Sequence, residues 1–104
     1  MYFLNVLYPA PAGSHFDWDY YVQTHVPLAH RLLDPQGLVR IEIAKGVSGF
    51  PPGTPPAYVA VARLYFRTRE ELVNALSVSA GTLIDDVANY TDVQPVVQIS
   101  EVVE

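Results

Sequence analysis

The order of its patterned segments is the feature that most constrains the fold of this chain. Four segments have the apolar, β-branched and aromatic composition of strands, and two have the spacing and end signals of helices. The strands are expected at 2–8, 38–46, 57–66 and 95–103, and the helices at 17–33 and 68–88. This strand-helix-strand-strand-helix-strand order predicts an α+β, ferredoxin-like βαββαβ fold with a four-stranded antiparallel sheet.

The polarity of the strands supports this topology independently of their order. The first and third strands lie in the middle of such a sheet, and segments 2–8 and 57–66 are apolar on both faces, with Asn5 and Arg63 as their only strongly polar members. Segments 38–46 and 95–103 carry charged and amide side chains. Edge strands commonly carry such side chains, because these discourage pairing with other chains.

The first helix has a clear beginning and an interruption. Asp17 is a suitable N-cap, and Phe16 before it is placed to pack on Tyr21 as a hydrophobic staple. Pro27 has no backbone donor, so the helix is expected to kink or loosen there. A capping box at Thr68 begins the second helix, which is expected to break near residues 79–81.

The charge content points to an oligomer. Only 16% of the 104 residues are charged, against about 25% in ordinary soluble proteins. The length predicts a single domain over residues 1–104. Two helices cover only one face of a four-stranded sheet, and the strand at 57–66 is too apolar on both faces for either to meet water. We therefore expect a homodimer whose sheets pack face to face.

Several classes of function are disfavoured. The net charge is −5 and no cluster of Lys or Arg is present, which argues against nucleic acids and anionic membranes as partners. No apolar run approaches the length of a membrane span, and no targeting segment is recognisable, so a cytoplasmic location is expected. Cysteine is absent, which excludes disulfides, thiolate zinc sites and a cysteine nucleophile.

His25 stands out because it lies in the middle of the apolar stripe of the first helix. The stripe consists of Trp18, Tyr21, Val22, Leu28, Ala29, Leu32 and Leu33. One interpretation is a core histidine bonded to a carbonyl or a tyrosine. The other is a general acid–base, or a donor to a substrate carbonyl, in an apolar pocket. In that case Tyr21, on the same face, is expected to orient His25 by a hydrogen bond.

Other polar residues give weaker signals. His15 and His30 do not share a face with His25, and neither a metal site nor a cofactor is expected. Arg63 should be buried and paired with Glu42, Glu101 or a ligand carboxylate. Asp85 and Asp86 should form a solvated helix end. The predicted ligand-binding residues are Trp18, Arg63, Tyr65 and Tyr90.

Four segments carry a family resemblance: LYP at 7–9, FDWDYYVQTHVPLAHRLL at 16–33, PPAYVAVARLYF at 55–66 and NYTDVQPVVQISEV at 89–102. In combination they resemble the EthD family, named for a protein associated with ethyl tert-butyl ether degradation. The resemblance implies a dimeric α/β barrel and places the family's His-x-Pro histidine at His25. Relatives with this barrel include cofactor-free monooxygenases, lactone isomerases, polyketide cyclases and haem enzymes, so the fold does not select a reaction.

These observations predict a homodimer that binds a small apolar organic molecule. It would act on that molecule as a cofactor-independent oxidoreductase, monooxygenase, isomerase or cyclase, in the catabolism of ethers or related compounds, with His25 and Tyr21 as catalytic residues. The alternative is a non-catalytic ligand-binding or accessory module, with the loop at 46–57 as its partner contact. Haem binding through His25 is a third, more distant interpretation. The pocket lies either between helices and sheet or inside the dimer barrel.

Overall fold

The computed structural model describes all 104 residues and has the predicted ferredoxin-like α+β architecture. The helices are α1 (Trp18–Tyr20), α2 (Val26–Leu33) and α3 (Arg69–Asp86). The strands form one antiparallel sheet in the order β2-β3-β1-β4, with bounds β1 (Tyr2–Pro9), β2 (Leu38–Lys45), β3 (Tyr58–Phe66) and β4 (Val96–Glu101). The two apolar segments are thus the central strands, as their composition predicts.

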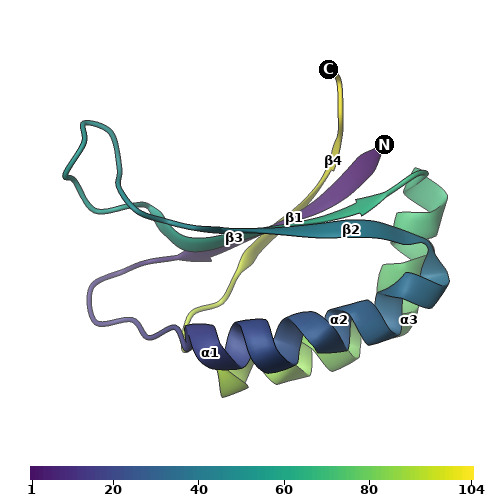
Figure 1. Cartoon of the computed structure of the whole chain (residues 1–104), viewed down its shortest axis with the longest axis horizontal. Helices are drawn as coiled ribbons and strands as arrows, with labels where there is room; N and C mark the ends of the chain where they lie inside the picture. Colours follow the sequence, from purple (N-terminus) through teal and green to yellow (C-terminus); the bar gives the residue numbers. More distant parts are fainter.

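All helices lie on one side of the sheet, and no helix covers the opposite face (Figure 1). We call this uncovered side the open face. The β2–β3 connection projects beyond the end of the sheet as a long loop (Figure 1). None of the helices has the length and apolarity needed to cross a membrane.

A π-helical turn, Tyr21–His25, joins α1 to α2 and confirms the expected loosening before Pro27. The side chain of Asp17 caps the helix by accepting a hydrogen bond from the backbone N–H of Tyr20 at 3.1 Å. The backbone N–H of Val26 then donates to the carbonyl of Tyr21, which widens the turn. Such π-turns commonly occur at functional sites, because they change the direction of side chains within a helix.

The second long helix, α3, is continuous, so the break expected near residues 79–81 is wrong. Its N-cap is Thr68, whose hydroxyl accepts from the backbone N–H of Glu71 at 3.1 Å. Ser79 is buried, and Gln36 donates to its hydroxyl at 2.9 Å. A single glycine such as Gly81 costs a helix only about 1 kcal/mol relative to alanine, which tertiary packing readily offsets. A 3-10 turn, Val87–Asn89, follows the helix.

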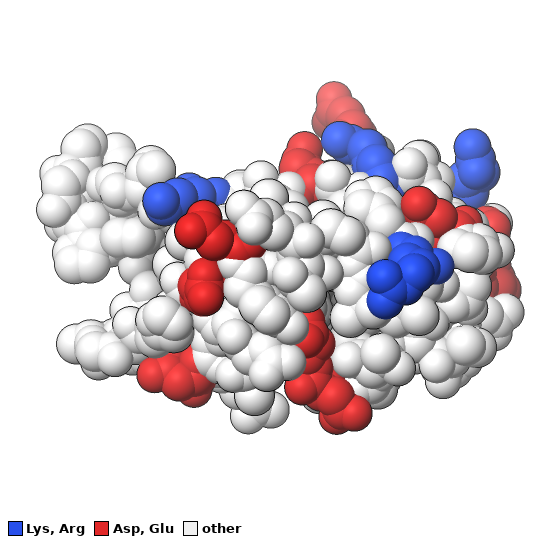
Figure 2. All heavy atoms as spheres, turned by 60° about the horizontal axis from the view of Figure 1, so that its bottom comes forward, with Lys and Arg blue, Asp and Glu red and all other residues white.

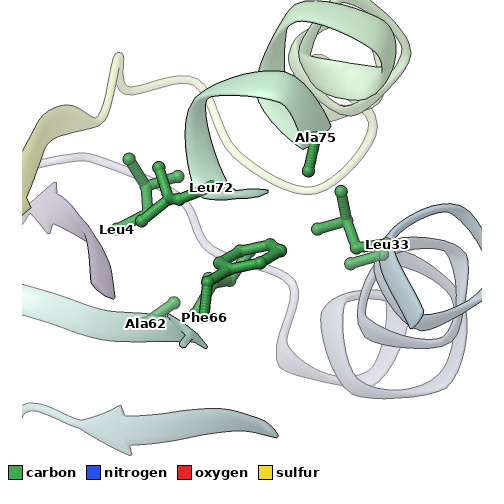
Figure 3. Close-up of a cluster of buried hydrophobic side chains, with 8 residues drawn as sticks. Leu4, Leu33, Ala62, Phe66, Leu72 and Ala75 are labelled. Carbon is green, nitrogen blue, oxygen red and sulfur yellow. The ribbon is translucent and has the colours of Figure 1, made fainter. Parts of the chain in front are cut away.

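The core between the helices and the sheet has two parts. The first part is mainly aliphatic, and six of its members converge from β1, β3, α2 and α3 in Figure 3: Leu4, Leu33, Ala62, Phe66, Leu72 and Ala75. The second part is aromatic and consists of Tyr8, Tyr21 and Tyr90 around Ala60. The aromatic part lies beside the π-turn and so brings polar hydroxyl groups into an otherwise apolar interior.

On the open face, Arg63 differs from its prediction. It does pair with Glu42, with 4.0 Å between Nη1 and Oε1, but its side chain is 45% exposed rather than buried. The cause is the absence of any covering element on this face. Tyr65 is nevertheless buried on the same face, because the guanidinium of Arg40 lies 4.3 Å from its ring centroid.

Candidate functional site

A cavity of about 150 Å³ lies between the helices and the sheet. A second, more polar hollow of about 450 Å³ lies on the open face and is lined by Arg63 and Tyr65 among others. Of the 18 residues that line the cavity between the helices and the sheet, 16 are hydrophobic, and they come from all four strands, from the π-turn and from α2 and α3. Two of them, Ile84 of α3 and Val97 of β4, are 67% and 53% exposed. The cavity therefore opens to solvent between α3 and β4.

His25 is held at the cavity wall by a carboxylate. Its Nδ1 lies 2.8 Å from Oδ2 of Asp86, the last residue of α3, and both side chains are largely buried. The other oxygen of Asp86 accepts hydrogen bonds from the hydroxyl of Tyr20 at 2.6 Å and from the amide of Asn89 at 2.9 Å. The π-turn, α3 and the following 3-10 turn thus meet at this carboxylate.

The protonation state of Asp86 decides which nitrogen of His25 carries a free lone pair in the neutral ring. Burial acts to raise the pKa of Asp86, but the hydrogen bonds from Tyr20, Asn89 and His25 outweigh it and the pKa is lowered. The group is therefore a carboxylate and accepts the Nδ1–H of His25. In the neutral ring this leaves the lone pair on Nε2, the nitrogen turned away from Asp86.

Two tyrosine hydroxyls lie on the Nε2 side of the ring. The hydroxyl of Tyr90 is 3.4 Å from Nε2, a long and weak contact, and 2.7 Å from the hydroxyl of Tyr8. Burial raises the pKa of both tyrosines above the ordinary value. Both groups therefore stay as neutral hydroxyls and form a short polar chain that ends at His25.

Tyr21 does not orient His25 in the way the sequence predicts. The two rings stack, with centroids 5.5 Å apart and an interplanar angle of 15°, and no hydrogen bond joins them. The orienting hydrogen bond comes from Asp86 instead. Residues one helical turn apart lie one above the other, and in the π-turn this places the flat faces of these two rings together.

The structure brings some of the predicted site residues together and separates others. His25 and Tyr21 line the cavity, and Tyr90 lies behind them against His25. Trp18 packs on Tyr21, with ring centroids 5.8 Å apart, but does not line the cavity. Arg63 and Tyr65 lie on the open face, on the other side of the sheet. A ligand-binding role for these two residues stays a prediction, and it concerns the open face rather than the cavity.

Asp86 is the main residue that sequence reasoning missed, since it was expected to be solvated. A signal was available, because the inward-facing side chains of α3 recur at helical spacing. They are Leu72, Ala75, Ser79 and Leu83. Asp86 lies three residues after Leu83 and therefore falls on the same stripe, whereas the exposed Asp85 does not. A carboxylate that continues a buried stripe needs a partner.

On the face of the molecule that carries the helices, acidic side chains outnumber basic ones and both are spread among uncharged ones (Figure 2). No basic cluster is visible on it (Figure 2). No three His, Asp or Glu side chains come together in a way that could hold a metal ion. The side chains with polar groups that line the cavity are His25, Tyr8 and Tyr21.

The EthD domain model matches residues 13–94, which include the whole His25 and Asp86 arrangement. The chain belongs to the EthD family. An EthD-like protein from Ralstonia eutropha JMP134 is 36% identical in sequence, and the match covers 99% of this chain and 92% of that chain with a TM-score of 0.91. The search of curated proteins finds no match.

Two further solved structures extend the comparison of the fold. An EthD family protein from Bacillus halodurans C-125 is 20% identical, with 98% of each chain covered and a TM-score of 0.68. A dimeric ferredoxin-like protein from an uncultured marine organism is 10% identical, with 100% of this chain and 96% of that chain covered and a TM-score of 0.56. At these identities the likeness shows the ferredoxin-like fold alone, in agreement with the EthD assignment.

Proposed function

We propose that this EthD protein binds a small, neutral, largely apolar organic molecule in the cavity and exchanges a proton with it through His25. The observation that carries the proposal is the His25–Asp86 pair at the wall of an otherwise hydrophobic cavity. Asp86 fixes the ring and leaves Nε2 to act as a general base. Proton transfer by a positioned side chain of this kind typically contributes about 10²–10⁴ in rate.

The size and lining of the cavity support a neutral ligand of modest size. An engineered apolar protein cavity of about 150 Å³ binds benzene, so a single ring or a branched chain of similar bulk is the expected fit. No Lys, Arg, Asp or Glu lines this cavity. A charged ligand would lose its hydration there without gaining an opposite charge, which is costly.

Removal of a proton from carbon is the first step of more than one reaction. The resulting carbanion or enolate can take the proton back at another carbon, as in an isomerase, or attack a carbonyl carbon of the same molecule, as in a cyclase. It can also react with dioxygen, as in a cofactor-independent monooxygenase. These routes require the same base in the same apolar surroundings. The family name suggests a setting in the degradation of ethers or related compounds.

We further propose that the protein is a homodimer formed through the open face. That face carries an apolar strip made of residues paired across three neighbouring strands: Leu7, Val61 and Ala44. Oδ1 of Asn5 is buried there without a hydrogen-bond partner. A second sheet would cover the strip and could supply a donor to Asn5, and the relative from the uncultured marine organism is described as dimeric.

Ligand binding is tested by thermal denaturation with toluene, using a variant that fills the cavity. Toluene is expected to raise the Tm of the wild type. Ala80 lines the cavity from α3, so Ala80→Leu should abolish this rise. Ala88 is exposed outside the cavity, so Ala88→Leu adds the same group and should leave the rise intact. A wild-type protein that toluene does not stabilise would contradict the proposal.

The alternative function, a non-catalytic accessory module, is favoured by one observation. The loop between β2 and β3 is held by its own hydrogen bonds, from Gly49 N to Thr54 O at 2.8 Å and from Thr54 Oγ1 to Pro51 O at 2.7 Å, and presents Phe50 at 93% exposure. This alternative predicts stabilisation by ligand without any proton exchange on it. Proton exchange on a bound molecule that His25→Gln abolishes would rule it out.

A further inference from the structure

The hydroxyl of Tyr21 is a polar group of the cavity to which the proposed function gives no role. Tyr21 is 2% exposed and lines the cavity, and its hydroxyl makes no close hydrogen bond, only a weak interaction with the hydroxyl of Tyr8. Tyr8 and Tyr90 differ from it, because their hydroxyls bond to each other at 2.7 Å. A hydroxyl that lines a cavity with only this weak partner is incompletely satisfied, so a ligand that offers a hydrogen-bonding atom would gain binding free energy at this position.

The chemical state of this hydroxyl narrows the choice of ligand atom. Burial, followed by the neighbouring Tyr8 hydroxyl, raises the pKa of Tyr21 above its ordinary value. The group therefore keeps its proton and can donate a hydrogen bond. A donor calls for an acceptor atom on the ligand, and the hydrophobic lining restricts that acceptor to a neutral one, such as a carbonyl or ether oxygen.

The position of Tyr21 beside the base distinguishes among neutral acceptors. Its ring stacks on the imidazole of His25, and both residues line the same cavity. A ligand oxygen held by Tyr21 is therefore held in the same small cavity as the imidazole of His25. Between a carbonyl and an ether, only the carbonyl makes the neighbouring C–H acidic enough for an imidazole base, because the electron pair that the proton leaves behind can move onto the oxygen.

We propose that the substrates are small, neutral carbonyl compounds that can enolise, with Tyr21 donating to the carbonyl oxygen while His25 removes the adjacent proton. Nε2 takes the proton, the C–H electron pair becomes a carbon–carbon double bond, and the carbonyl π pair moves to the oxygen beside the Tyr21 hydroxyl. Return of the proton to carbon regenerates His25, so no co-reactant is needed. The inference rests on the proposed function and names its class of substrate.

The binding test uses two ring compounds that differ in the oxygen, cyclohexanone and cyclohexene. The wild type should bind cyclohexanone about 3- to 10-fold more tightly, as expected for one net hydrogen bond. Tyr21→Phe keeps the stacked ring and removes only the hydroxyl, so it should bind both compounds with equal affinity. Tyr58→Phe removes a hydroxyl outside the cavity and should keep the wild-type preference.

The reaction test follows deuterium uptake from D2O into the carbons next to the carbonyl of cyclohexanone. The wild type should accelerate uptake above the buffer rate. Tyr21→Phe should lower the accelerated rate about 10²-fold, the usual loss of one donor to a developing oxyanion. His25→Gln should return uptake to the buffer rate, and Tyr58→Phe should match the wild type.

The outcomes separate this inference from the proposed function. If the wild type binds neither ring, the proposed function itself fails. If cyclohexene binds but the preference for cyclohexanone survives in Tyr21→Phe, Tyr21 is not the carbonyl donor and the inference is overturned. If cyclohexanone binds through Tyr21 without any catalysed deuterium uptake, the assignment of enolisable substrates is overturned.

Discussion

At the scale of single residues, the proposed chemistry depends on a carboxylate that does not line the cavity. Asp86 holds Nδ1 of His25 and is itself held by Tyr20 and Asn89. This is the arrangement in which a carboxylate fixes the tautomer of an imidazole so that the opposite nitrogen is available as a base. In the proposed reaction Asp86 is therefore a positioning residue, and His25 is the residue that would meet the substrate.

Replacing Asp86 should affect catalysis more than binding. Asp86→Asn should lower the deuterium uptake into cyclohexanone at least about 10-fold, because the ring loses the partner that fixes its tautomer. Binding of cyclohexene, which needs no base, should stay within about twofold of the wild type, since nonpolar contacts dominate it. Asp85→Asn changes the exposed neighbouring carboxylate and should match the wild type in both measurements. Equal losses in the two variants would contradict the positioning role.

The lowered pKa of Asp86 also predicts how stability depends on pH. A carboxyl group with a lower pKa in the folded than in the unfolded protein stabilises the fold above its unfolded-state pKa, and this contribution is lost as the pH falls through its folded-state pKa. The wild type should therefore be more stable than Asp86→Asn near neutral pH. The difference should shrink in acid, below the ordinary value of 3.8. Urea denaturation of both proteins across this range measures it, and a difference that does not change with pH would contradict the assignment.

At the scale of elements, the π-turn is what turns His25 toward Asp86. Pro27 cannot donate a backbone hydrogen bond, so the turn before it is free to widen, and Tyr21–His25 adopts π geometry. The start of this helix was predictable from Asp17 and its loosening from Pro27, because both signals act within a few residues. The pairing of His25 with Asp86 was not predictable in the same way, since 61 residues separate them. It depends on how α2 packs beside α3.

Pro27→Ala tests the role of the π-turn. Alanine restores the missing donor and favours a regular α-helix, so the turn should narrow and rotate His25 away from Asp86. Deuterium uptake should fall about 10-fold or more while the Tm stays equal or rises, because proline is a poor residue inside a helix. Pro35→Ala, in the 3-10 turn at residues 34–36, is the control and should keep the activity. Full activity in Pro27→Ala would show that the π-turn is not required.

At the scale of the whole molecule, the two faces of the sheet have different roles. The helix-covered face holds the cavity, whereas the open face carries an apolar strip, a buried unpaired Asn5 oxygen and partly exposed Arg63. The low charge content, 16%, agrees with the apolar central strands, and the oligomer predicted from it stays a prediction. The same sequence pattern could not tell which side holds the cavity, because β3 is apolar on both. Only the packing of α2 and α3 distinguishes them.

The proposed dimer gives the last prediction. Val61 lies at the centre of the open face, paired with Leu7 and Ala44, so Val61→Asp would bury an unpaired carboxylate in each half of a face-to-face interface. Sedimentation velocity should show the wild type as a dimer and Val61→Asp as a folded monomer. Val78→Asp places the same charge on a 72% exposed position of α3 and should stay dimeric. A wild-type monomer would contradict the dimer, and its Asn5 oxygen would then need a partner from solvent. Because the cavity lies on the other side of the sheet, the Val61→Asp monomer should still bind cyclohexene, which separates assembly from ligand binding.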